Sequence, residues 1–311
     1  MAYRLLLGRE PESAGAVAGH VATCPDLAAL RARFLNSEEY TSRTVVKLSP
    51  QFDLGKPVRV DVNVTRDLLD KMLCRVEETW RYLGAVEPYW SVITAEKYKQ
   101  ANFSENASDF YESGQGEVNR LFAWLMRNDV NINTESASCC EYGCGTGRVT
   151  RWLAARFSKV IACDISQPHI DRARENLNRL GTSNVTFHQI GSLDALSTLS
   201  PVDVVFSFIV LQHNPPPVMA LILSNLLRIL KPGGVAFFQV PVYSLSYAFT
   251  AEDYVEQPLT HKMEMHVLPQ KHIHAIAREQ KCDLLEVGPD GFAGMPGWLS
   301  MTFLMRKRGS S

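Results

Sequence analysis

The sequence predicts an α/β protein with a doubly wound, seven-stranded and mostly parallel sheet, preceded by a helical N-terminal extension. Three observations predict this fold. Apolar, β-rich runs alternate with segments that repeat apolar residues at helical spacing over residues 137–306. The connections between them are short, which favours parallel strands joined by right-handed crossovers. Finally, three glycines fall between the first strand and the first helix of this alternating region, where a ligand can approach the main chain.

The first strand–helix unit surrounds these glycines, Gly143, Gly145 and Gly147. Residues 137–142 are predicted to form a buried strand, and residues 148–157 an amphipathic helix. The start of such a helix offers free N–H groups and a positive dipole end to an electron-rich ligand. The next apolar run ends directly before Asp164. An acidic residue at the end of the second strand of an α/β unit is where a ribose diol is hydrogen-bonded.

The remaining elements continue the alternation. In chain order we predict a helix over 167–180, strands over 185–190 and 202–211, a helix over 218–230, a strand over 235–242, a helix over 272–280, and strands over 284–287 and 299–306. Lys231-Pro-Gly-Gly234 is predicted to end the fourth helix and to form a turn. Before the sheet, 64–83 is predicted as a long amphipathic helix and 88–116 as an irregular, aromatic-rich segment.

The glycine-rich loop differs from the dinucleotide-binding fingerprint. That fingerprint has the spacing G-x-G-x-x-G, whereas the spacing here is G-x-G-x-G and Arg148 stands in the place of the last glycine. Glu141 puts a negative charge near the loop, which suits a cationic ligand better than a pyrophosphate. The segment Glu141-Tyr-Gly-Cys-Gly-Thr-Gly-Arg148 resembles motif I of the class I, seven-stranded S-adenosylmethionine-dependent methyltransferases. The resemblance extends over residues 116–308 and includes the Lys-Pro-Gly-Gly sequence.

The resemblance implies that S-adenosyl-L-methionine is the cofactor and that the last strand is antiparallel. Asp164 would bind the ribose hydroxyls, and Ile165 would lie against the adenine. Ser192 stands in the loop beside the adenine edge, where many family members have an acidic residue. Tyr111, before the first strand, would close over the methionine portion. The implied cofactor-binding residues are Tyr111, Glu141, Gly143, Cys144, Gly145, Thr146, Gly147, Asp164, Ile165, Ser192, Leu193 and Phe208.

Three histidines are candidates for a general base. If the acceptor is a hydroxyl, its proton must leave, and a histidine is the usual group that takes it. His213 follows the strand predicted over 202–211, at the end of the sheet where α/β sites lie. His261 and His266 lie in 243–269, where acceptor-binding insertions occur in the resembled family. Each of the three also has a purely structural interpretation, in which it closes a loop or lies at the surface.

Other acceptors and a metal site are less well supported by the sequence. Transfer to an amine or a carboxylate needs no base and stays an alternative. Asn214-Pro-Pro-Pro217 is similar to the Asn-Pro-Pro-aromatic motif of amino-group methyltransferases, but it lies too late and lacks the aromatic residue. We predict instead that Asn214 caps a helix whose first turn contains the prolines. We predict no metal site, because no acidic pair follows the strand and Asp203 lies at its other end.

Composition limits the organisation and the partners. A length of 311 residues allows one large domain and a smaller appendage, and the net charge of −1, with both signs dispersed, predicts no nucleic-acid partner. No apolar run is long enough to span a membrane, and no signal peptide is expected. The seven cysteines lack paired or metal-binding spacing. Cys139, Cys140, Cys144 and Cys163 lie in or beside predicted central strands and are predicted to be buried thiols in a cytoplasmic protein.

The N-terminal residues suggest an appended module. Residues 1–45 resemble a small helical bacterial module, similar to phycobilisome linker repeats, that is often attached to surface-glycan enzymes. An ordinary helical pair is the alternative interpretation. We therefore predict a helical module over 1–45, a helical linker and cofactor lid over 46–115, and a methyltransferase core over 116–311. The resemblance suggests a saccharide or other small polar acceptor and a protein partner at 1–45; a non-catalytic scaffold that binds the cofactor is the rival hypothesis.

Overall fold

The computed structural model describes residues 11, 13–35, 37, 56–192 and 194–309. The chain divides into two units, Met1–Gly55 and Lys56–Ser311. In the first unit the structure describes helices α2 (Ala14–Thr23) and α3 (Leu27–Leu35), and much of the module predicted over 1–45 lies outside the described residues. The oxygen of Ser13 accepts the N–H of Ala16 (3.1 Å) and so caps α2.

The second unit is built on a seven-stranded sheet. Its strands are β1 (Ser138–Tyr142), β2 (Lys159–Asp164), β3 (Val185–Gln189), β4 (Val202–Ser207), β5 (Leu230–Ser244), β6 (Cys282–Asp290) and β7 (Trp298–Lys307). Their order is β3-β2-β1-β4-β5-β7-β6. The pairs from β3 to β5 are parallel, whereas β7 runs antiparallel to both of its neighbours. The predicted α/β fold, with its mostly parallel sheet and antiparallel last strand, is confirmed.

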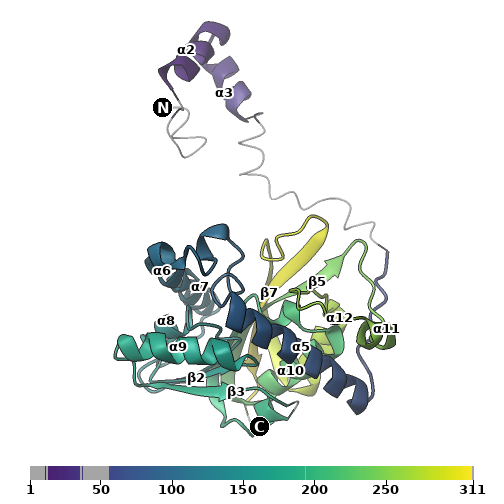
Figure 1. Cartoon of the computed structure of the whole chain (residues 1–311). Coiled ribbons are helices and arrows are strands. Elements are labelled where there is room, and N and C mark those ends of the chain that lie inside the picture. The colour runs from purple at the N-terminus through teal and green to yellow at the C-terminus, as the bar shows by residue number, and fades with distance from the viewer. Residues whose placement is uncertain (1–10, 12, 36, 38–55, 193, 310–311) are drawn as a thin grey trace. The chain divides into compact units, whose positions relative to one another are not determined.

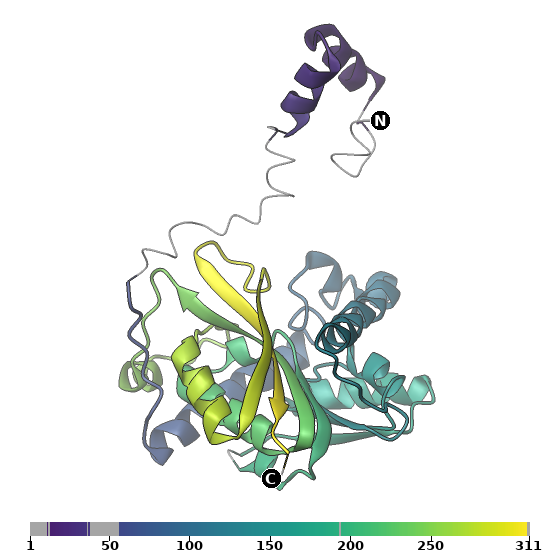
Figure 2. The same cartoon turned by 180° about the vertical axis from the view of Figure 1, so that it is seen from behind.

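Helices cover both faces of this sheet (Figures 1 and 2). They are α5 (Arg66–Val86), α6 (Phe103–Glu112), α7 (Gly114–Arg127), α8 (Thr150–Ala154), α9 (Gln167–Arg179), α10 (Pro216–Arg228), α11 (Ala251–Glu256) and α12 (Gln270–Glu279). Side chains of α5, α10 and α12 share one apolar core with Cys140 of β1, and side chains of α7 and α8 share another with its neighbour Cys139. Successive strand residues point to opposite faces, so the sheet is buried on both sides.

Strand β4 ends four residues before the predicted end at 211, because the backbone turns sharply at Ile209. This residue has φ +57°, a conformation that is costly for a β-branched side chain. The N–H of Ile209 donates to Oε1 of Gln239 on β5 (3.2 Å), which helps to hold the turn. The 3₁₀ turn η4 (Leu211–His213) follows directly. The turn therefore carries His213 across the end of the sheet instead of along a longer strand.

Two further sequence predictions were wrong. Lys231-Pro-Gly-Gly234 is not a turn between elements but part of β5, whose pairing with β4 moves from Val202–Leu230 to Val204–Val235. This bulge accommodates the proline, which has no N–H for a ladder. The segment 88–116 is not irregular throughout, since it contains α6 and the start of α7. Phe103 and Phe110 of α6 pack in a small aromatic cluster of their own, so no long apolar stripe marked the helix.

Within the residues that the structure describes, we find no helix of sufficient length and apolar character to cross a membrane.

Candidate active site

The three glycines of the loop after β1 all have left-handed backbone conformations. The φ angles are +81° at Gly143, +51° at Gly145 and +84° at Gly147. A Cβ atom on Gly143 would lie 2.3 Å from Cγ2 of Val210, and one on Gly145 would lie 2.9 Å from Cγ2 of Val92. Glycine is therefore required here both for the backbone angles and for the close approach of neighbouring chain segments.

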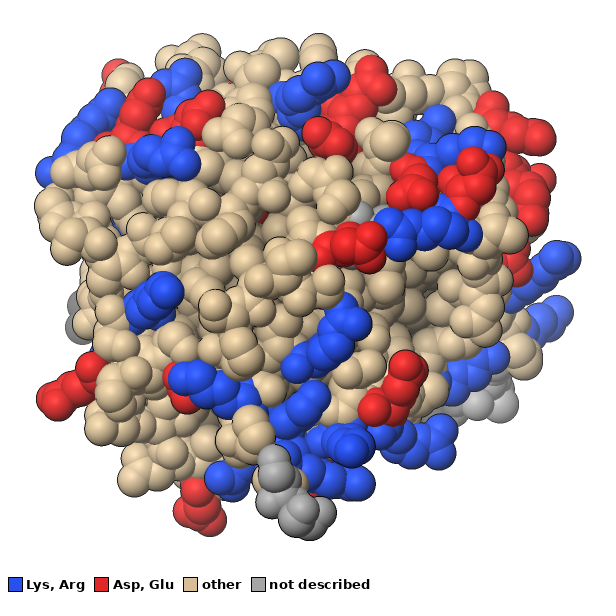
Figure 3. Space-filling view, turned by 90° about the horizontal axis from the view of Figure 1, so that it is seen from below, with Lys and Arg blue, Asp and Glu red and all other residues tan. Residues whose placement is uncertain are grey.

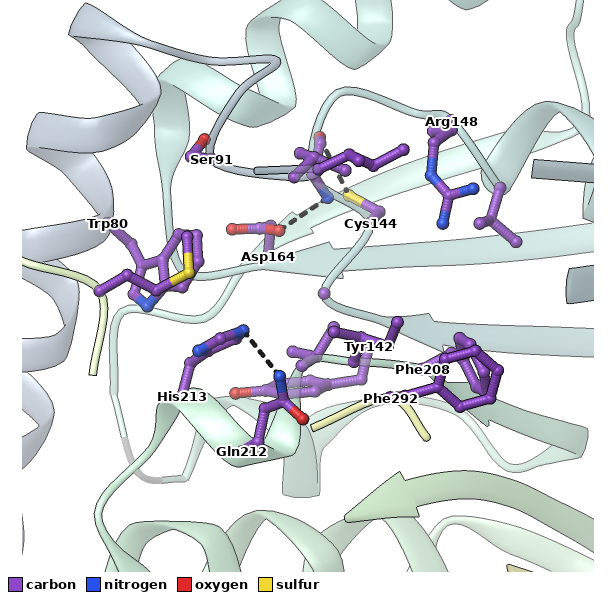
Figure 4. Close-up of a pocket in the computed structure, with 18 of the residues that line it drawn as sticks. Trp80, Ser91, Tyr142, Cys144, Arg148, Asp164, Phe208, Gln212, His213 and Phe292 are labelled. Carbon is purple, nitrogen blue, oxygen red and sulfur yellow. Dashed lines mark hydrogen bonds between the residues drawn. The ribbon is translucent and has the colours of Figure 1, made fainter. Parts of the chain in front are cut away.

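Asp164, the last residue of β2, holds this loop in place. Its Oδ2 accepts the N–H of Gly145 (2.8 Å), and its Oδ1 accepts the N–H of Ser166 (2.9 Å) just before α9. The carbonyl of Cys163 accepts the N–H groups of Gly143 (2.8 Å) and Cys144 (3.0 Å). A carboxylate offers about four lone-pair sites, so Asp164 retains acceptor capacity for the hydroxyls of a ribose. Figure 4 shows this carboxylate on the side of the cavity opposite His213.

A cavity of about 670 Å³ lies at the carboxyl ends of β1, β2 and β4, where ligands bind in α/β sheets. The predicted site residues that line it are Glu141, Gly143, Cys144, Gly145, Asp164, Ile165, Phe208 and His213. The described residues Tyr111, Thr146, Gly147, Ser192, His261 and His266 are not among its lining, and Leu193 lies outside the described residues. The structure thus brings together the motif, the end of β2 and one of the three histidines.

Tyr111 packs away from the cavity, in the aromatic cluster of α6. Its ring meets Phe110 edge-on at 5.1 Å, its carbonyl accepts the indole N–H of Trp152 (2.8 Å), and burial raises its pKa. The segment between α5 and α6 also reaches the glycine loop. Val92 lies against Gly145 and lines the cavity. The segment predicted as a lid is therefore at the site, but through different side chains.

Glu141 and Arg148 form a polar pair on the cavity wall. Burial raises the pKa of Glu141 to about 8, and the neighbouring Arg148 guanidinium opposes this shift. Among the described residues, neither Oε2 of Glu141 nor Nε of Arg148 has a hydrogen-bond partner. Arg148 donates through Nη1 to Ser113 (3.1 Å), and burial lowers its pKa. A carboxyl group beside a guanidinium fits a ligand group with an ammonium and a carboxylate, as the methionine portion of S-adenosylmethionine has.

His213 is held in one orientation by the segment after α11. Its Nδ1–H donates to the carbonyl oxygen of Glu264 (2.8 Å), and its ring lies 5.2 Å from that of Trp80. Because a carbonyl can only accept, the proton is on Nδ1 and the lone pair is on Nε2, which is 3.4 Å from the amide nitrogen of Gln212. Burial lowers the pKa of His213 to about 4. The imidazole is therefore neutral near pH 7 and can accept a proton at Nε2.

The other two candidate histidines have structural surroundings. Nδ1 of His266 lies 2.9 Å from the hydroxyl of Tyr247, and Nε2 lies 3.3 Å from the carboxylate of Glu264. The same carboxylate accepts the hydroxyl of Tyr254 (2.8 Å). His261 stacks on Tyr82 with ring centroids 4.7 Å apart. Of the three, only His213 lines the cavity.

The structure adds cavity residues that sequence reasoning missed. His169, in the first turn of α9, is buried, and its Nε2 lies 2.9 Å from Ser91 Oγ and 3.2 Å from the carbonyl of Pro88. Burial lowers its pKa. Trp80 of α5 also lines the cavity, and its carbonyl accepts the hydroxyl of Ser166 (2.9 Å). Both occupy helix positions where spacing alone indicates packing, so the sequence held no separate signal for them.

The predicted capping role of Asn214 is wrong. Helix α10 begins at Pro216 after Pro215, and no side chain caps it. The amide of Asn214 instead donates to the carbonyls of Val210 and Leu211 (3.3 Å each), inside the turn that follows β4. Asn214 thus stabilises the turn that carries His213, and the prolines occupy the first turn of the helix as predicted.

Comparisons with known proteins agree with this geometry. The family described as "Methyltransferase domain" matches residues 140–234. A ubiquinone biosynthesis O-methyltransferase from Nitrosomonas europaea is 30% identical over 164 residues, which are 50% of this chain and 67% of that protein. This chain belongs to the methyltransferase family. A tRNA 5-carboxymethoxyuridine methyltransferase from Escherichia coli is also 30% identical, over 43% of this chain and 54% of that protein. The chain thus spans about half the length of this relative.

A solved methyltransferase structure shares the fold. Magnesium protoporphyrin IX methyltransferase from Synechocystis PCC 6803, with S-adenosylhomocysteine bound, superposes with a TM-score of 0.52. The superposition covers 75% of this chain and 98% of that chain, at 20% identity. The same enzyme with S-adenosylmethionine bound gives a TM-score of 0.51 at 18% identity. At this identity the likeness supports the class I methyltransferase fold.

We expect Gly143→Ala to destabilise the protein more than Gly233→Ala. Both glycines have φ +81°, but a Cβ at 233 meets nothing within 4 Å, whereas one at 143 meets Val210. Both variants carry the cost of a left-handed alanine, and overpacking adds roughly 1–3 kcal/mol at 143 alone. Urea denaturation measures the difference in the free energy of unfolding. Equal losses of unfolding free energy in the two variants would show that a Cβ atom at 143 does not overpack against Val210.

We expect Glu141→Gln to make the unliganded protein relatively more stable as the pH rises. A carboxyl whose pKa is raised from 4.5 to about 8 on folding favours the folded state at low pH, and this contribution is lost between those values. The Glu141→Gln variant does not lose this contribution, so its unfolding free energy should rise relative to that of the unchanged protein. The expected rise is up to about 1.4 kcal/mol per pH unit. Thermal unfolding from pH 5 to pH 9 measures it, with the exposed Glu135→Gln as control. A pH-independent difference would contradict the prediction.

Proposed function

We propose that this protein transfers the methyl group of S-adenosylmethionine to a hydroxyl oxygen of a small acceptor. The observation that carries the proposal is the position of His213. Its neutral imidazole lines the same cavity as the glycine loop and Asp164. A base beside a nucleoside-type site fits the transfer of a methyl group to oxygen, because the hydroxyl proton must be removed.

Each group of the chain has a defined part in this proposal. When bound, S-adenosylmethionine supplies a methyl group on a positively charged sulfur. Asp164 holds the ribose, and Glu141 with Arg148 binds the amino and carboxylate groups of the methionine portion. Nε2 of His213 would take the proton of the acceptor hydroxyl as that oxygen receives the methyl group. The residues of the site would mainly orient the reactants and exclude water.

The relatives do not point to a single acceptor or partner. The matched relatives are named for tRNA, ubiquinone biosynthesis and trans-aconitate, which are chemically unlike one another. A saccharide hydroxyl and a protein partner at residues 1–45 stay predictions that rest on the N-terminal resemblance, and the cytoplasmic location is likewise a prediction. Acidic and basic side chains are mixed over the upper part of the face seen from below, and Lys and Arg gather along its lower part (Figure 3). With a tRNA methyltransferase among the relatives, the low net charge is a weak argument against RNA.

Two rival functions differ from this proposal in what they require. Transfer to an amine or a carboxylate needs no base, so the orientation of His213 would then be incidental. A scaffold that binds the cofactor without catalysis would need Asp164 but no acceptor site. We favour transfer to a hydroxyl because the imidazole of His213 lines the cavity and its Nδ1 proton is held by Glu264, which leaves Nε2, 3.4 Å from the side-chain amide of Gln212, as the nitrogen that can accept a proton.

We expect Asp164→Ala to weaken the binding of S-adenosylhomocysteine at least about a hundredfold. A hydrogen bond to a charged group contributes about 1.5–3 kcal/mol, and two ribose hydroxyls are involved. Asp203→Ala is the matched control, because Asp203 also accepts a backbone N–H, from Ser138 (2.8 Å), but lies at the opposite end of the sheet. Calorimetry measures both affinities. Equal binding by the Asp164 variant and the intact protein would refute the proposed cofactor site.

We expect His213 to stay neutral, with its proton on Nδ1, from pH 5.5 to pH 8. Its pKa of about 4 places the titration below this range, so kcat/KM should show no fall near the ordinary histidine pKa of 6.5. Nitrogen NMR of labelled histidine reads the tautomer and the pKa directly.

His213→Ala tests the role of the imidazole in turnover. Loss of a positioned base typically lowers kcat by about 10²–10⁴-fold. The assay is release of S-adenosylhomocysteine across a panel of hydroxyl-bearing compounds, and binding of S-adenosylhomocysteine confirms that the variant is folded. Near-normal turnover would reject base catalysis and favour an amine or carboxylate acceptor.

A further inference from the structure

Beyond the glycine loop, much of the cavity wall is formed by apolar side chains. They come from three segments far apart in the sequence: Phe208 and Ile209 after β4, Met263 and Met265 after α11, and Phe292 and Met295 between β6 and β7. The charged side chains that line the cavity, Glu117, Glu141, Arg148 and Asp164, belong to none of these three segments. The part of the cavity available to an acceptor is therefore chemically distinct from the part that suits the cofactor.

The polar groups on these segments are engaged within the protein. The Asn214 amide donates to two carbonyls of its own turn, and the Gln212 carbonyl oxygen accepts the amide of Gln239 (3.3 Å). Glu264 lies between the two lining methionines, yet its carboxylate is bonded to Tyr254 and His266. An acceptor that carries hydroxyls on every side, as a saccharide does, would leave most of them without hydrogen-bond partners in this part of the cavity. Each buried, unpaired polar group costs free energy.

The aromatic part of the wall is fixed in position. Phe208 and Phe292 meet edge-on with centroids 4.7 Å apart, and the guanidinium of Arg120 lies over both rings, at 5.6 Å and 4.7 Å. Figure 4 shows these two rings together, on the side of the site away from Trp80. The methionines that also line the cavity are flexible and polarisable, so they can adapt to a planar surface. Fixed rings and adaptable thioethers together fit a flat apolar body.

We infer that the acceptor carries its hydroxyl on a planar, apolar body such as an aromatic ring system, and not on a saccharide. The inference rests on the proposed function for the role of the hydroxyl, which is directed at Nε2 of His213. The apolar body occupies the space between Phe292, Met263 and Met295. Met295 is 47% exposed, so the body enters from the side where the loop between β6 and β7 is open to solvent.

Calorimetry on the full chain, saturated with S-adenosylhomocysteine, tests the inference without any methyl transfer. We expect naphthol to bind at least about tenfold more tightly than methyl glucoside, with a negative heat-capacity change from apolar burial. Met295→Lys should weaken naphthol about tenfold, since it removes the contact of one apolar side chain. Met126→Lys is the control, because Met126 is 76% exposed on α7 and does not line the cavity.

The outcomes separate this inference from the proposed function. Tighter binding of methyl glucoside, binding of neither probe, or naphthol binding that is indifferent to Met295→Lys would each overturn the planar, apolar acceptor. None of these results depends on turnover. If naphthol binds as expected but no hydroxyl compound is methylated, the proposed transfer to oxygen fails while the chemical character of the acceptor site stands.

Discussion

The site depends on the hydrogen bonds that the carboxylate of Asp164 accepts. It is buried at the end of β2 and takes N–H groups from Gly145 and from Ser166, so it joins the glycine loop to the start of α9. A buried carboxylate must be hydrogen-bonded, and the N–H of Gly145 meets it while the loop has its left-handed conformations. The shape of the loop and the position of the proposed ribose contact are thus set by the same group.

A second constraint comes from the turn after β4. The left-handed Ile209 ends the strand early, Gln239 of the neighbouring strand holds its N–H, and the chain then places His213 beside Trp80. The carbonyl of Glu264, 51 residues later, fixes the orientation of the imidazole. Strain at a site persists only where the surroundings over-determine it. Here the packing of three segments supports one strained residue, and the result is a neutral imidazole held in one orientation.

Burial gives the cavity its electrostatic character. Glu141 is held largely protonated near neutral pH and His213 is held neutral, because the surroundings disfavour charge on either. A cationic ligand at this place would favour the ionised form of Glu141, so protonation and cofactor binding are coupled. The apolar walls from the segments after β4 and α11 and between β6 and β7 strengthen such interactions by keeping water away. One cavity therefore combines polar and charged side chains from the glycine loop and the end of β2 with apolar side chains from the other segments.

The sequence alone determined the alternation of strands and helices, the glycine loop and Asp164, because these depend on local spacing and backbone preference. It misjudged the end of β4, the bulge at Lys231-Pro-Gly-Gly234 and helix α6. A continuous apolar run does not show where a strand ends, and a cluster of aromatic residues does not show that a helix is present. It also offered His213, His261 and His266 as candidates and favoured His213 only for its place at the end of a strand. Only the tertiary structure distinguished them, because the direction in which a side chain faces is set by partners such as Glu264, Tyr247 and Tyr82 that are distant in the chain or outside the local pattern.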